Sequence, residues 1–121
     1  MSPWLPATLA AHFSLSADGS RVVFASYLLS EQVYAADFDA RAGSIASPAL
    51  LTRGSRAWRY VDVSADGRRL VLTAFYPQED VFVADASGDN LRQITNDAAN
   101  DRGVRWSPDG SRIVYHSARP F

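Results

Sequence analysis

The chain has 121 residues, of which 47% are hydrophobic and 21% are charged, and this composition is typical of a single folded domain. Its 12 basic and 13 acidic residues leave a formal net charge of −1, so no overall positive field favours nucleic acid or an anionic membrane. Cysteine is absent, which excludes disulfides, thiolate nucleophiles and cysteine metal ligands but leaves the cellular compartment open.

At the start of the chain, Met-Ser-Pro-Trp lacks the basic and apolar regions of a signal peptide. Residues 4–11 could form one loose helical turn, and no later segment has a sustained helical period with caps at both ends. Every apolar run is far shorter than the roughly 20 residues that span a bilayer. We therefore expect a chain without membrane insertion and without a targeting signal in these residues.

The turn motif Ser-x-Asp-Gly then occurs three times, within residues 16–22, 64–70 and 107–113. The motif aspartates Asp18 and Asp66 are 48 positions apart, and Asp66 and Asp109 are 43 apart. Ser and Asp side chains can hydrogen-bond nearby backbone, and Gly supplies the positive φ of a type I turn followed by a bulge. Each copy therefore predicts a tight hairpin.

Strand patterns flank every turn. Alternating runs precede it at residues 13–15, 60–63 and 104–106, and continuous apolar runs follow it at 21–24, 70–72 and 113–115. The continuous runs are typical of strands that are covered on both faces. Two further strands complete the first repeat at 33–36 and 50–52 and the second repeat at 81–84 and 91–95.

The two spacings also locate an insertion. The related segments 33–37 and 81–85 keep the offset of 48, whereas Leu51-Thr52 and Ile94-Thr95 keep the offset of 43. The five extra residues must lie between Asp37 and Thr52, in a stretch rich in small and turn-forming residues. We expect a lengthened hairpin loop there.

Four antiparallel strands per repeat of 43 to 48 residues predict an all-β fold made of four-stranded antiparallel blades of a β-propeller, with an ordinary sandwich as the alternative. Residues 1–121 would form a single partial propeller, with repeat one at about 11–53, repeat two at about 59–96 and a half repeat at 102–121. Propellers close with about four to eight blades, so the ring would be incomplete in one chain. We expect an excerpt of a larger propeller, because the third repeat stops within a blade; the alternative is that several copies complete one ring.

Residues 94–97 and 101–119 resemble the TolB-like, or WD-like, propeller repeat of bacterial proteins. The first two repeats are similar but degenerate, since Ala17 and Ala65 replace the Pro of the motif, which is present at Pro108. The resemblance implies a propeller that binds other proteins or gates a neighbouring catalytic domain, in the bacterial periplasm or cytoplasm. It does not imply one activity.

Motifs for catalysis are missing from the sequence. It contains no Gly-x-Ser-x-Gly, no His-Glu-x-x-His, no calcium loop and no phosphate loop. Its two histidines, His12 and His116, are predicted near strand ends about two blades apart. We therefore expect no catalytic residues, no metal and no cofactor.

Loops that join one repeat to the next are the better candidates for binding, because in a propeller they share one face with the loops between the second and third strands. The first such loop carries three guanidinium groups beside an indole, which could hold a carboxylate or phosphate or form a protein-binding hot spot. The second carries acidic groups and one further arginine. The candidate residues are Arg53, Arg56, Trp58, Arg59, Asp97, Asp101 and Arg102.

A structural interpretation competes with binding at these loops. Asp on one loop and Arg on the next could form ion pairs between adjacent blades, each worth under about 1 kcal/mol. Arg59 and Arg102 share the offset of 43, as do Trp58 and Asp101.

Three functions are consistent with these patterns. The first is a non-enzymatic module that binds a protein or peptide through its loop face. The second is a regulatory or gating fragment of a larger enzyme, such as a prolyl-oligopeptidase-type serine peptidase, or of a bacterial sensor protein. The third is a self-assembling propeller fragment. The expected partners are a protein or peptide, together with remaining blades in cis or other copies of the chain.

Overall fold

The computed structural model describes residues 10–27, 31–76 and 78–119. Within these ranges the chain forms ten strands and no helix. Most of the helical turn expected at residues 4–11 lies outside the described residues, and its last two residues belong to the first strand. The strands are β1 (Ala10–Leu15), β2 (Arg21–Tyr27), β3 (Glu31–Asp39), β4 (Ser44–Leu50), β5 (Ala57–Val63), β6 (Arg69–Tyr76), β7 (Val81–Asp85), β8 (Arg92–Gln93), β9 (Asn100–Trp106) and β10 (Ile113–Ala118).

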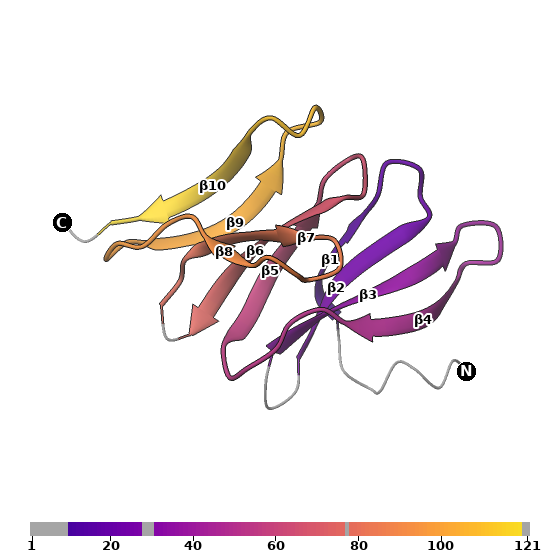
Figure 1. Cartoon of the computed structure of the whole chain (residues 1–121), viewed down its shortest axis with the longest axis horizontal. Coiled ribbons are helices and arrows are strands. Elements are labelled where there is room, and N and C mark those ends of the chain that lie inside the picture. Colours follow the sequence, from indigo (N-terminus) through magenta and orange to yellow (C-terminus); the bar gives the residue numbers. More distant parts are fainter. Residues whose placement is uncertain (1–9, 28–30, 77, 120–121) are drawn as a thin grey trace.

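The strands form three antiparallel sheets in the chain order expected of propeller blades. The first blade has the order β1-β2-β3-β4, the second β5-β6-β7-β8, and a two-stranded half-blade contains β9 and β10. Figure 1 shows the sheets side by side, from the indigo and magenta first blade to the yellow β10. The all-β fold of incomplete propeller blades is therefore confirmed, and the sandwich is excluded.

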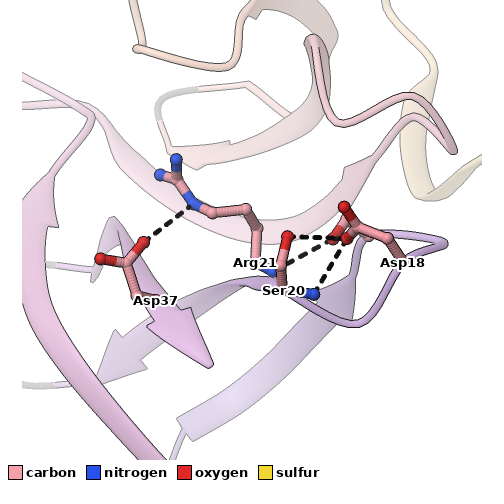
Figure 2. A network of polar contacts seen from close by, with 5 residues as sticks. Asp18, Ser20, Arg21 and Asp37 are labelled. Atoms are coloured by element: carbon pink, nitrogen blue, oxygen red, sulfur yellow. Dashed lines mark hydrogen bonds and ion pairs between the residues drawn. The ribbon is translucent and has the colours of Figure 1, made fainter. Parts of the chain in front are cut away.

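All three Ser-x-Asp-Gly motifs form the same turn. Their glycines have φ of 71° or 72°, and each glycine N–H donates to the motif serine carbonyl at 2.8 to 2.9 Å. Each serine hydroxyl donates to the motif aspartate at 2.6 to 2.7 Å, and that aspartate accepts the backbone N–H two positions later. Figure 2 shows the first copy, where Asp18 accepts from Ser20. The predicted hairpins are confirmed.

The prediction of a lengthened loop between Asp37 and Thr52 is wrong. β3 continues to Asp39 and β4 begins at Ser44, so the extra residues lengthen two paired strands and leave only a short turn at residues 40–43. A register shift after Ala35 and a φ of 53° at Ser47 accommodate them. β4 is an exposed edge strand that needs little apolar packing, which is why its small residues and its Pro resembled a loop.

The last strands of the repeats also differ from expectation. β4 ends at Leu50, the first residue of the predicted strand at 50–52, and β8 contains only two of the five residues predicted at 91–95. Both are outer strands with mostly exposed side chains, so hydrophobic alternation does not mark their ends.

Two apolar clusters hold the sheets together. The first joins blades one and two and includes Trp58, whose ring packs edge-on against Phe82 with centroids 5.0 Å apart. The second joins blade two to the half-blade through Val71, Val81 and Val104. Leu72 belongs to the first cluster and Val71 to the second, so β6 is covered on both faces as predicted. Full burial of such side chains stabilises the fold by roughly 1.5–3 kcal/mol each.

Candidate functional site

Four of the seven candidate residues lie in strands instead of loops. β5 begins at Ala57 and therefore contains Trp58 and Arg59, whereas β9 begins at Asn100 and contains Asp101 and Arg102. Irregular pairing at the start of β5 hides the alternation that would have marked it. The other three, Arg53, Arg56 and Asp97, lie in the connections between blades.

Two candidates point into the interior. Trp58 is 1% exposed and belongs to the first apolar cluster. Asp101, at the equivalent position of the next repeat, is 2% exposed, and its N–H donates to the Glu79 carbonyl at 2.8 Å. Neither side chain contributes much surface to the loop face.

Arg59 forms a two-point contact with the preceding blade. Its Nη2 and Nε lie 2.9 and 3.2 Å from the two carboxylate oxygens of Glu31, at the start of β3. Its guanidinium also lies over the Phe75 ring, 3.5 Å from the centroid. A planar guanidinium held by a bidentate carboxylate and an aromatic face has a fixed orientation.

Arg102 forms a single-point ion pair at the equivalent position one blade later. Its Nε lies 2.6 Å from Oε2 of Glu79, which is 48 positions after Glu31. The inter-blade interpretation is confirmed for both arginines, but the expected aspartate partners are wrong. The carboxylates are glutamates two positions before Val33 and Val81, the first buried apolar residues of the third strands, and the shared offset of 48 was the signal that could have found them.

The remaining candidates are closer to the surface. Arg53 is exposed, and the Arg56 guanidinium lies 4.9 Å from the Phe82 ring centroid and 6.0 Å from that of Trp58. Asp97 accepts the Ala99 N–H at 2.8 Å and lies 3.6 Å from the Arg119 guanidinium. The face therefore combines fixed and accessible arginines with aromatic rings.

A buried polar network lies beneath these residues. Asp80 is almost fully buried and accepts hydrogen bonds from Gln93 Nε2 at 3.1 Å and from the Thr95 hydroxyl at 3.4 Å. Burial raises the pKa of the Asp80 carboxyl, and the charges of Asp101 and Asp97 raise it further. The first blade has a neutral version of this network, in which the Thr52 hydroxyl donates to Gln32 Oε1 at 2.5 Å.

The histidines lie in different sheets. His12 packs edge-on against Tyr60 with ring centroids 4.9 Å apart, and its pKa is lowered by burial and by the Arg105 charge. His116 is exposed on β10. In the described part of the chain, no group of three or more His, Cys, Asp or Glu residues could hold a metal ion. No helix formed by those residues is long and apolar enough to cross a membrane.

This geometry defines the chain as a partial β-propeller with two full blades and half of another. No family model and no curated protein matches the chain. Its fold is similar to a putative TolB from Agrobacterium tumefaciens, with 23% identity and a TM-score of 0.75 over 96% of this chain and 40% of that one. TolB from Acinetobacter baumannii follows with 19% identity and a TM-score of 0.71 over 91% of this chain and 27% of that one.

The tricorn protease is also similar, with 16% identity and a TM-score of 0.66 over 91% of this chain and 11% of that one. The chain thus spans less than half the length of each of these three structures. These likenesses establish the TolB-like propeller fold.

Proposed function

We propose that the chain is a non-enzymatic interaction module that binds a protein or peptide on the face formed by its inter-blade connections. The observation that carries this proposal is the fixed Arg59, which is held by Glu31 and lies over the ring of Phe75. Phe75 is itself exposed, so an arginine and an aromatic ring are presented together. Arginine and aromatic side chains are the types enriched among residues that dominate binding energy.

Preorganisation is the physical advantage of this arrangement. A side chain that is already ordered loses little conformational entropy when a ligand binds, whereas a free arginine loses about 0.5–1.5 kcal/mol. The exposed Arg53 and the half-buried Arg56 add positive charge on the connection that leads into β5. The ligand chemistry that fits is a polypeptide with a carboxylate next to an apolar side chain.

Peptide display tests this proposal. Dodecapeptides selected on the immobilised chain should be enriched in Asp and Glu. An Arg53→Ala, Arg56→Ala, Arg59→Lys variant, in which the lysine keeps a cation for Glu31 but lacks the planar guanidinium, should bind them about tenfold more weakly, a loss of about 1.4 kcal/mol. The matched control is an Arg41→Ala, Arg68→Ala variant, whose arginines are exposed in turns at the opposite ends of the strands. Selected peptides that bind the first variant as well as the unmodified chain would exclude this face.

A second function, the regulatory or gating propeller of a larger enzyme or sensor, is favoured by the fold likeness to the tricorn protease. The sequence of the gene on both sides of the segment distinguishes the two functions. A hydrolase domain in the same reading frame would support the second function, and a reading frame that holds only propeller repeats would exclude it.

A further inference from the structure

A pocket lies between the first and second blades, beside the end of the outer strand β4. Its volume is about 270 Å³, which is smaller than the roughly 300–1,000 Å³ of pockets that hold drug-sized ligands. The lining comes from the end of β4 and the connection after it, from β6 and β7, and from the turn between β7 and β8. Both flanking blades have four strands, so the pocket belongs to a complete interface between blades.

The buried part of the lining is apolar. It consists of Leu70 and Leu72 of β6 and Ala84 of β7, with exposed fractions of 0, 1 and 6%. Leu50 and Leu91 also line the pocket, and they are 50% and 47% exposed. An apolar group that enters the pocket therefore covers leucine side chains that now contact water, and this burial favours binding.

Backbone hydrogen bonds hold both walls of the pocket in place. On one side, the Leu51 N–H donates to the Val33 carbonyl at 2.8 Å. On the other side, the Asp85 N–H donates to the Asp89 carbonyl at 2.9 Å, and the Gly88 N–H donates to the Asp85 carbonyl at 2.8 Å. A pocket whose walls are already ordered loses little conformational entropy when a ligand binds.

Opposite charges lie on these two walls. Arg53, in the connection after β4, and Asp89, in the turn between β7 and β8, are both exposed and both line the pocket. Among the residues that the structure describes, no ion pair involves either side chain. The Ser87 hydroxyl donates to Oδ2 of Asp89 at 3.0 Å, which orients the carboxylate and leaves Oδ1 as an acceptor. The guanidinium can therefore bind a carboxylate, and Asp89 can bind an ammonium group.

The next pair of blades lacks this combination of residues. The offset of 43 transfers Leu50 to Gln93 and Arg53 to Asn96, which are both polar and neutral. The Gln93 side chain donates to Asp80 at 3.1 Å, within the polar network of its own blade. The repeat therefore does not require a leucine and an arginine at these positions, and their chemistry is particular to this pocket.

We propose that this pocket binds one free apolar α-amino acid, such as leucine. The ligand side chain covers Leu70, Leu72 and Ala84, its carboxylate binds Arg53 and its ammonium group binds Asp89. A free amino acid fits the two charges, because a residue at either end of a polypeptide keeps only one of them. The ligand differs from that of the peptide-binding face proposed above, although both sites use Arg53.

NMR of the full chain with carbon-13 in its leucine methyl groups tests this proposal. Unlabelled L-leucine should shift the methyl signals of Leu50, Leu70, Leu72 and Leu91 saturably, with a dissociation constant of about 1 mM or less. Leu15 is the internal control, because it is 43% exposed but lies outside the pocket, and its signals should not shift. Isocaproate and isopentylamine each lack one of the two charges and should bind at least about fivefold more weakly.

Variants of the two charged residues locate the ligand. Arg53→Gln and Asp89→Asn should each weaken leucine binding about fivefold. The matched control is Arg41→Ala, since Arg41 is exposed in the turn between β3 and β4 and does not line the pocket. All three side chains are exposed, so the variants should keep the melting temperature of the unmodified chain.

Three results would overturn the proposal: shifts that do not saturate by about 10 mM leucine, unchanged binding by either charged-residue variant, or isocaproate binding as tight as that of leucine. Asp89→Asn also separates this site from the proposed peptide-binding face. It keeps Arg53, Arg56 and Arg59, so the acidic peptides selected on the chain should bind it normally. Either function can therefore fail in these experiments without the other.

Discussion

Gly88, in the turn between β7 and β8, lies directly against the backbone of Leu51 in the connection that follows the first blade. A Cβ at Gly88 would lie 2.2 Å from the Leu51 carbonyl oxygen and 3.1 Å from its Cα. The φ of Gly88 is +88°, a conformation that L side chains rarely adopt. The two blades thus touch through backbone alone at this point, and no side chain fits between them.

Gly88→Ala should therefore destabilise the fold strongly. Backbone strain and the clash with a neighbouring blade should together cost about 3 kcal/mol or more in the free energy of unfolding. Gly43→Ala is the matched control, because Gly43 has a φ of +62° but a Cβ added there would have nothing within 4 Å, so only about 1 kcal/mol is expected. Urea denaturation of both variants measures the difference. Equal losses would show that the Gly88 contact does not matter for stability.

Much of the fold could be predicted from the sequence because the strongest sequence patterns reflect local structure. The three turns need Ser, Asp and Gly at fixed positions, and a double-covered strand such as β6 needs a continuous apolar run. β4 and β8 were misjudged because an exposed edge strand satisfies its backbone with few packing requirements. Whether Trp58 and Asp101 are buried depends on which face of their strand packs against the neighbouring blade. The spacing of residues in the sequence does not determine this face where the strand pairing is irregular, as at the start of β5.

Gly110→Val should disrupt the third hairpin. Valine resists the φ of +71°, and a Cβ there would lie 2.9 Å from Nη2 of Arg69, which donates to the Gly110 carbonyl at 2.7 Å. We expect a loss of about 1–3 kcal/mol in the free energy of unfolding. Hydrogen exchange should show the loss of protection in β9 and β10 first. Ser117→Val, at an exposed position of β10, is the control, and an unchanged melting temperature for Gly110→Val would contradict the turn assignment.

The motif aspartates should remain ionised to low pH. Hydrogen bonds from Ser16 and from the N–H and hydroxyl of Ser20 lower the pKa of Asp18 to about 2. A lowered pKa stabilises the folded chain above the ordinary aspartate pKa, and this contribution is lost as the pH falls from about 4 towards 2. NMR titration of the side-chain carboxyl carbons measures these pKa values directly.

Ser20→Ala provides the matched comparison for this titration. It removes one hydroxyl donor and makes the first turn similar to the second, where Arg68 occupies the same position. The pKa of Asp18 should rise but stay below its ordinary value, because the Ser16 hydroxyl and the backbone N–H still donate. The pKa of Asp109 should not change, and a shift there would show that the effect is global.

Asp80→Asn should leave the chain at least as stable at neutral pH. The raised pKa of Asp80 means that the fold favours its protonated form, so its contribution is complete below the ordinary aspartate pKa and is lost as the pH rises through the raised value. Asn keeps an acceptor for Thr95 without the charge, and Gln32 already serves this role in the first blade. Thermal melts between about pH 4 and 8 should show a smaller pH dependence than in the unmodified chain. Asp37→Asn, on the exposed end of β3, is the control, and a large loss of stability in Asp80→Asn alone would contradict this account.

Asp62 contacts residues of all three sheets. We expect its replacement to lower the free energy of unfolding more than the replacement of any other aspartate in the chain. Its carboxylate accepts hydrogen bonds from the Ser14 hydroxyl of blade one and, at 2.7 Å, from the backbone N–H of Trp106 in the half-blade. The carboxylate also lies 3.8 Å from Nη1 of Arg105. Asp62→Ala would leave these donors unpaired inside the blade interfaces, at a cost of about 2–4 kcal/mol in the free energy of unfolding. Asp62→Asn keeps one acceptor and should lose about half as much. Asp39→Ala removes a carboxylate that accepts two backbone N–H groups within one exposed turn, so its loss should stay near 1 kcal/mol or less. If urea denaturation gives the same midpoint for Asp62→Ala and Asp39→Ala, contacts between blades through Asp62 do not hold the sheets together.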